Sequence, residues 1–159
     1  MKSRVLFAAL LSVAALMIVT AAFAAPAAAT GVPFKGTIEA VETNDVQFPT
    51  LYVDGTGSGN ATHLGRYTVS YQAVVNIPTL TGNDALQFVA ANGDSIYAEG
   101  LGQAVPSGTP DVVSILENYS ITGGTGRFAG ATGSFTVKRL LNQATNVTSG
   151  AFDGSIVLH

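Results

Sequence analysis

The chain has 159 residues, with 7 Lys or Arg, 10 Asp or Glu and no Cys, and its formal net charge is −3. A sparse acidic charge argues against binding to nucleic acid or anionic lipid, because both need clustered Lys and Arg. The absence of cysteine excludes disulfides and lipid attachment through a cysteine. Charged residues make up 11% of the chain, against about 25% in typical globular proteins.

The first 29 residues have the pattern of a signal peptide. Lys2 and Arg4 precede an apolar run over residues 5–22, and small-residue cleavage motifs end at Ala24 and Ala29. The alternative is a retained membrane anchor, because the run approaches the ~18 residues that begin to span a bilayer. No basic cluster follows the run to stop transfer. We therefore expect cleavage near one of the two alanines, no stable anchor afterwards, and a secreted protein, extracellular or periplasmic.

Residues 30–159 form the second part, a single domain in which apolar and polar side chains alternate as in strands. The predicted strands, in chain order, are 34–40, 51–54, 66–75, 85–91, 95–101, 113–121, 135–141 and 151–158. Residues 55–60 and 106–110 are predicted surface loops. Eight short antiparallel strands favour a sandwich or a closed barrel, and closure removes the exposed edges that promote aggregation.

Asn92-Gly93 is the strongest two-residue hairpin signal, because both positions of such a turn need a positive φ. A hairpin centred there pairs Phe88 with Tyr97 and Val89 with Ile96.

The segment 121–135 contains a fit to the dinucleotide fingerprint over residues 124–129. That fingerprint binds phosphate only where a helix starts at the glycines. Gly130 and Gly133 disfavour a helix, and strand alternation follows them. We therefore interpret the segment as a long connection between two antiparallel strands, with Phe128 anchored in the core.

Two segments resemble motifs of a known barrel superfamily. Residues 121–130 resemble the Gly-Gly-Ser/Thr-Gly-x-Phe-x-Gly segment of plant allene oxide cyclases, and residues 59–67 resemble a segment of small secreted bacterial proteins in that superfamily. The resemblance covers residues 32–159 and implies an all-β domain, a single eight-stranded antiparallel β-barrel also found in dirigent proteins. Both plant groups are commonly trimeric, so the resemblance also implies a homotrimer.

The cyclases use a Glu-x-Asn, a following proline, a tyrosine and a cysteine to steer an epoxide ring closure. Glu42 and Asn44 match the Glu-x-Asn, and Pro49 falls two residues early for the proline. These three residues are the catalytic candidates if the chain is an isomerase or cyclase acting on an unsaturated, lipid-like substrate.

The other two cyclase positions do not match. The cysteine position falls on Tyr71 and the tyrosine position on Asn118, while Tyr119 lies one residue away and therefore on the opposite face. A strand end entering a solvated turn also explains Glu42 and Asn44. We therefore favour a protein that is not an enzyme.

Glu117 and Arg139 each interrupt the apolar face of a predicted strand. A hairpin symmetric about Phe128 places them opposite each other, which predicts an inward ion pair. A bulge at Lys138-Arg139 would instead turn the arginine outward.

Neither a catalytic triad nor a metal site is indicated, because the only histidines are His63 and His159 and no close ligand spacing occurs. His63 shares the alternation phase of Tyr67 and Tyr71, which would point it inward near a barrel mouth, although an ordinary packed or half-exposed histidine is the simpler interpretation.

The expected function is binding of a small apolar ligand in the lumen, or action by surface association, with no cofactor and no metal. A lipocalin is excluded because its Gly-x-Trp start needs a tryptophan, which the chain lacks. The candidate ligand-binding residues are Glu117, Arg139, Tyr119, Tyr71 and His63. The sequence leaves open whether the lumen is hollow or filled with side chains.

Overall fold

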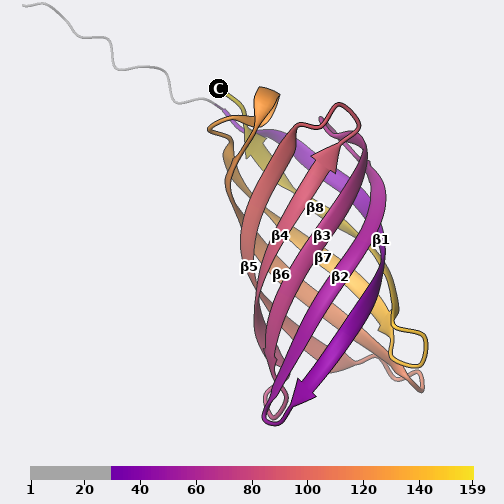
Figure 1. Ribbon diagram of the computed structural model, residues 1–159. Coiled ribbons are helices and arrows are strands. Elements are labelled where there is room, and N and C mark those ends of the chain that lie inside the picture. Colours follow the sequence, from indigo (N-terminus) through magenta and orange to yellow (C-terminus); the bar gives the residue numbers. More distant parts are fainter. Residues whose placement is uncertain (1–29) are drawn as a thin grey trace, which may run out of the picture.

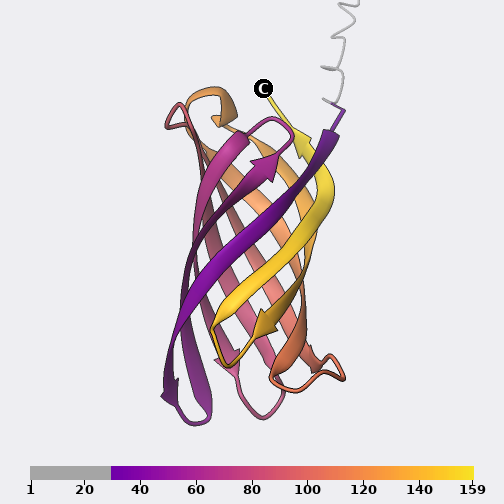
Figure 2. The ribbon, with the colours of Figure 1, turned by 90° about the vertical axis from the view of Figure 1, so that its right-hand side faces the viewer.

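The computed structural model describes residues 30–159, which form one closed antiparallel β-barrel of eight strands (Figure 1). The strands are β1 (Val32–Gln47), β2 (Thr50–Ala61), β3 (Gly65–Asn76), β4 (Thr81–Ala90), β5 (Ser95–Pro106), β6 (Val112–Gly124), β7 (Thr132–Asn142) and β8 (Val147–Val157). Each strand pairs with the next, and β8 pairs with β1 to close the barrel. Figure 2 shows β8 (yellow) and β1 (indigo) side by side. The predicted all-β barrel is confirmed. The predicted signal peptide lies outside the described residues.

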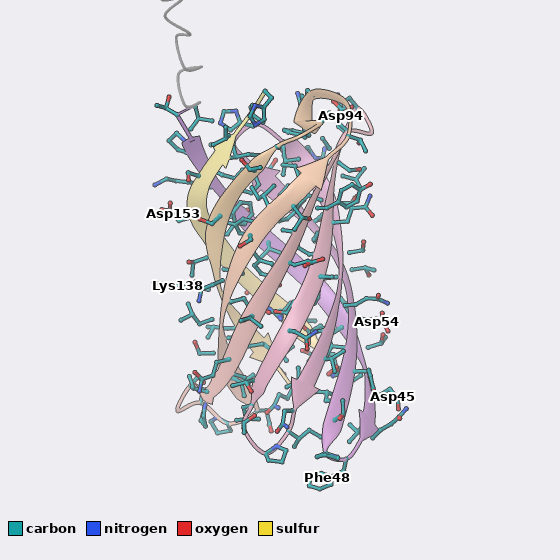
Figure 3. The ribbon with its side chains drawn as sticks, turned by 90° about the vertical axis from the view of Figure 1, so that its left-hand side faces the viewer. Asp45, Phe48, Asp54, Asp94, Lys138 and Asp153 are labelled. Atoms are coloured by element: carbon teal, nitrogen blue, oxygen red, sulfur yellow. The ribbon has the colours of Figure 1, made fainter. Side chains whose placement is uncertain are left out.

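The barrel has two ends that differ in their connections. We call the end that carries the connections 62–64, 91–94 and 125–131 the aromatic end, and the end that carries 48–49, 77–80, 107–111 and 143–146 the cavity end. Figure 3 shows Asp94 at the first and Phe48 at the second. Within residues 30–159, no helix has the length and apolarity to cross a bilayer.

The prediction of a loop over residues 55–60 is wrong, because these residues belong to β2. Gly55, Gly57 and Gly59 alternate along the strand on its inward side. A Cβ at Gly55 would overlap the ring of Tyr71, and one at Gly59 would lie 2.6 Å from the Tyr67 hydroxyl. The glycines therefore make room inside the barrel for two tyrosines of β3, whereas their local composition suggested a loop.

The β4–β5 hairpin differs by one residue from the predicted register. Phe88 lies opposite Ile96, and Val89 lies opposite Ser95. Ala90 donates to the carbonyl of Asp94, so the turn inside this hydrogen bond has three residues rather than two, and the extra residue is accommodated by Gly93 at φ 89°. The shift turns Ile96 into the core.

The glycine-rich segment connects β6 and β7, as predicted, through the short 3-10 helix η1 (Gly126–Phe128), and Phe128 is fully buried. The register is shifted by two residues from the predicted one, so Glu117 lies opposite Val137 and Ile115 opposite Arg139. A shift of two keeps each side chain on its expected face. The ladder continues without a bulge at Arg139, which therefore points inward.

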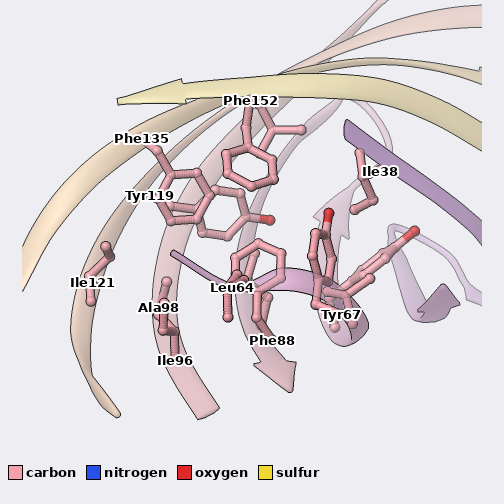
Figure 4. Close-up of a cluster of buried hydrophobic side chains, with 14 of the residues drawn as sticks. Ile38, Leu64, Tyr67, Phe88, Ile96, Ala98, Tyr119, Ile121, Phe135 and Phe152 are labelled. Atoms are coloured by element: carbon pink, nitrogen blue, oxygen red, sulfur yellow. The ribbon is translucent and has the colours of Figure 1, made fainter. Parts of the chain in front are cut away.

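Aromatic side chains fill the half of the barrel next to the aromatic end. Figure 4 shows Tyr119 stacked on Phe135, with ring centroids 5.1 Å apart, and Phe152 beside them. Tyr67 and Phe88 meet edge to face at 4.9 Å. Such ring contacts stabilise the barrel beyond the effect of the apolar area that the rings bury. The packed rings close this half of the lumen.

Candidate functional site

The other half of the lumen contains a cavity of about 330 Å³. Aliphatic side chains form most of its wall, among them Leu51, Val53, Val75, Val113, Ile115 and Leu141. Ala73, Gly82, Gly102 and Ala104 also line the cavity, and their small side chains leave the space that rings occupy elsewhere. The lining extends to the exposed Leu80 and Gln143, so the cavity reaches the surface at the cavity end.

A buried charged cluster lies at the inner end of the cavity, centred on Arg139, which is 6% exposed. Its Nε and Nη2 donate to the two carboxylate oxygens of Glu117 at 2.9 and 2.8 Å. Its Nη1 donates to Oε1 of Glu42 and, at 3.1 Å, to the Thr148 hydroxyl. The predicted Glu117–Arg139 ion pair is thus present, and a second carboxylate shares the guanidinium.

Glu42 is 3% exposed and lies within β1, so its interpretation as a solvated strand end is wrong. Its Oε1 also accepts a hydrogen bond of 2.7 Å from the Tyr71 hydroxyl. Burial, more than any other influence, raises the pKa of Tyr71, which keeps the phenol protonated as a donor. Glu42 therefore has a cation and a phenol on one of its oxygens.

Burial by itself would lower the pKa of Arg139. The hydrogen bonds and charge of Glu117, together with Tyr71 and Glu42, outweigh that effect and raise it above the ordinary value. The guanidinium is therefore permanently charged and holds the two glutamates in place.

Asp84 is a site residue that the sequence interpretation missed. It is 7% exposed, it lines the cavity from β4, and the Tyr119 hydroxyl donates to its Oδ2 at 3.4 Å. Burial first, and then the charge of Glu117, raise the pKa of its carboxyl from 3.8 to about 7. The available signal was its inward phase, two residues before Leu86, but the strand had been predicted to start only at residue 85.

The remaining candidates lie apart from the cluster. Asn44 lines the cavity near its mouth and donates to Asn146 Oδ1 at 3.3 Å. Pro49 lies in the exposed β1–β2 turn and is not part of the cavity wall.

The inward placement of His63 is wrong. It is exposed in the β2–β3 turn at the aromatic end, far along the barrel from the cavity, and has φ 65°. The turn interrupts the alternation that had linked His63 to Tyr67 and Tyr71, so its phase no longer predicts its direction.

Four of the five predicted ligand-binding residues thus converge inside the barrel, namely Glu117, Arg139, Tyr119 and Tyr71. Among the described residues, no three His, Asp or Glu side chains form a group that could hold a metal ion. The arrangement offers an apolar chamber with a fixed polar inner end, which suits recognition of a molecule with an apolar body and a polar group.

Comparison of the chain with models of protein families, with curated proteins and with solved structures found no match. The functional argument therefore rests on the geometry of the cavity and the charged cluster.

Proposed function

We propose that the protein binds a small, mostly apolar molecule in the cavity, with a polar group of the ligand directed at the charged cluster. The observation that carries this proposal is the division of one lumen into an aromatic-filled half and a hollow aliphatic half. A barrel interior of eight strands is just wide enough to be filled by side chains or to hold one small ligand. Here both solutions occur in the same barrel.

The aliphatic cavity wall favours an apolar ligand. Removing apolar surface from water stabilises a complex by roughly 25 cal/mol per Å². The aliphatic wall has no hydrogen-bonding side-chain groups with which to bind a polar molecule. The volume of about 330 Å³ is near the lower end of the ~300–1,000 Å³ usual for small-molecule pockets. The ligand is therefore short.

The proposal includes export. The pattern of residues 1–29 supports a cleaved signal peptide, and the first strand begins shortly afterwards at Val32. A protein outside the cytoplasm would meet its ligand in the periplasm or the medium.

Binding can be measured with N-phenyl-1-naphthylamine, an apolar probe that is uncharged at neutral pH and fluoresces when removed from water. Ala73→Phe places a ring inside the cavity, whereas Ala85→Phe places the same ring on the outer face of β4. We expect saturable fluorescence with the wild type and Ala85→Phe, and none with Ala73→Phe.

Circular dichroism verifies that each variant is folded, and Ala104→Phe replaces Ala73→Phe if that variant does not fold. No saturable signal from the wild type would refute luminal binding. Equal binding by a folded variant with a filled cavity would place the probe elsewhere and refute it as well.

An allene oxide cyclase-like isomerase is the second candidate. The contact between Glu42 and Tyr71 at the inner end of the cavity favours it. Arg139 binds the same carboxylate oxygen, however, which engages Glu42 as a structural anion rather than leaving it free as a base. We expect no turnover of an unsaturated epoxide fatty acid. Turnover that disappears in Glu42→Gln would establish catalysis instead.

A further inference from the structure

We propose that the polar group of the luminal ligand is a protonated amine, held at the inner end of the cavity by Asp84 together with Glu117. This inference rests on the proposed luminal binding and specifies its ligand class: a short aliphatic or aromatic amine.

The two carboxyl groups line the same cavity and lie next to Gly102 of β5. A Cβ at this glycine would lie 2.8 Å from Glu117 Cγ and 3.2 Å from Asp84 Oδ2. Glu117 is opposite Gly102 in the ladder, and Asp84 is opposite Gly100, so the two acids approach each other diagonally across β5. A Cβ at Gly102 would crowd both acids, so the glycine allows them to lie close together against β5. Both acids line the cavity, from which a small head group would reach them.

Negative charge is in excess in this layer. Three carboxyl groups, those of Glu42, Glu117 and Asp84, are buried with a single cation, Arg139. The other cations of the described residues are on the surface: Lys35, Arg66, Arg127 and Lys138. A buried charge without a partner is costly, so a cation is the group that this layer lacks.

Asp84 is the acid with free hydrogen-bonding capacity. Glu117 uses both oxygens on Arg139, whereas Asp84 has only the long contact from Tyr119 to Oδ2. No donor among residues 30–159 hydrogen-bonds to Oδ1 of Asp84. Every fully buried side-chain oxygen in these residues does have a hydrogen-bond partner, so Oδ1 is not one of the fully buried atoms. Oδ1 is therefore accessible rather than enclosed, and Asp84 lines the cavity.

The surroundings of Asp84 determine how binding depends on pH. The ionisable groups that act on it come from three strands: Glu42 of β1, Glu117 and Tyr119 of β6, and Arg139 of β7. Burial of Asp84, followed by the negative charge of Glu117, holds the pKa of Asp84 near 7. An ammonium group therefore meets a neutral acid below that pH and a carboxylate above it.

The test compares octylamine, octanol and octanoate as competitors of N-phenyl-1-naphthylamine in the wild type, Asp84→Asn and Asp54→Asn. Asp54 is an exposed acid on the outer face of β2 and serves as the matched control. At about pH 8, a charge-assisted contact should make octylamine bind roughly tenfold more tightly than octanol, and octanoate the most weakly. The preference for the amine should disappear in Asp84→Asn and persist in Asp54→Asn.

In the wild type, the affinity for octylamine should rise about tenfold between pH 6 and pH 8, while the amine itself stays charged. This measurement needs no variant and decides the matter if Asp84→Asn does not fold. Equal affinities for the three competitors, or a preference for octanoate, would overturn the amine proposal while the bound probe leaves luminal binding intact. A probe that does not bind at all would instead refute luminal binding itself.

Discussion

Arg139 binds both carboxylate oxygens of Glu117 although the two residues are not opposite each other in the β6–β7 ladder. Glu117 is paired with Val137, so the arginine reaches it diagonally along the inner face. The ion pair depends on both side chains pointing into the lumen, and a shift of register by two residues does not remove it.

Arg139 should be the most sensitive position of the charged cluster. Arg139→Met leaves Glu42 and Glu117 buried without a cation, which should lower the free energy of unfolding by roughly 3–5 kcal/mol. The triple variant Glu42→Gln, Glu117→Leu, Arg139→Met removes all three charges and should be less destabilised than Arg139→Met alone. Urea denaturation measures both. A triple variant as unstable as the single one would show that hydrogen bonding, rather than charge balance, dominates the cluster.

The contribution of Asp84 to the stability of the protein should fall as the pH rises from about 4 to 7. In this window the folded protein keeps a proton on Asp84, whose pKa is raised from 3.8 to about 7, while the unfolded chain has released it. The loss approaches roughly 4 kcal/mol at most and is complete above the folded pKa. Asp84→Asn should remove this part of the pH dependence, and Asp54→Asn should retain it. Identical urea midpoint profiles for the wild type and Asp84→Asn would contradict the assignment.

Gly55→Ala should destabilise the barrel, because the new Cβ would overlap the ring of Tyr71 and displace its hydroxyl from Glu42. Overpacking of this kind costs about 1–3 kcal/mol. The neighbouring outward Thr56→Ala should change stability by less than about 0.5 kcal/mol. The cost of Gly55→Ala should shrink in a Tyr71→Leu background, and an undiminished cost in thermal unfolding would locate the clash elsewhere.

Export should remove the N-terminal segment after Ala24 or Ala29. The basic start and the apolar run motivate this expectation. Mass spectrometry of the protein from its native host gives the mature N-terminus directly. Recovery of the intact chain from membrane fractions would show a retained anchor instead.

We expect a homotrimer in solution, as the resemblance to the plant barrel families implies. The outer face of the barrel offers apolar side chains for such contacts, including Leu101, which is 70% exposed, and the neighbouring Leu116. Light scattering at micromolar concentration should give three times the chain mass, and Leu101→Lys should reduce it if this face is the interface. A wild-type monomer would remove the expectation.

Alternation along the chain was sufficient to predict antiparallel strands in a sandwich or a closed barrel, and the inward direction of Glu117 and Arg139, whereas the eight-stranded barrel itself was predicted from the motif resemblance. Strand geometry places every second side chain on one face, so a charge in an apolar phase is visible without a structure. Local composition failed where the deciding contact is distant. Gly55 to Gly59 have the composition of a loop, but they form a strand because tyrosines of β3 occupy the space they leave.

Only closure of the barrel decided which residues share the site. Glu42 of β1 and Arg139 of β7 are 97 residues apart and lie on strands separated by β8, and they meet because the sheet curves until its inner side chains converge. The same curvature brings Asp84 of β4 to this layer from the opposite side. The sequence determined the face that Glu117 and Arg139 would occupy, but the excess of buried acid and the cavity beside it arise from curvature and side-chain volume, which no local pattern encodes.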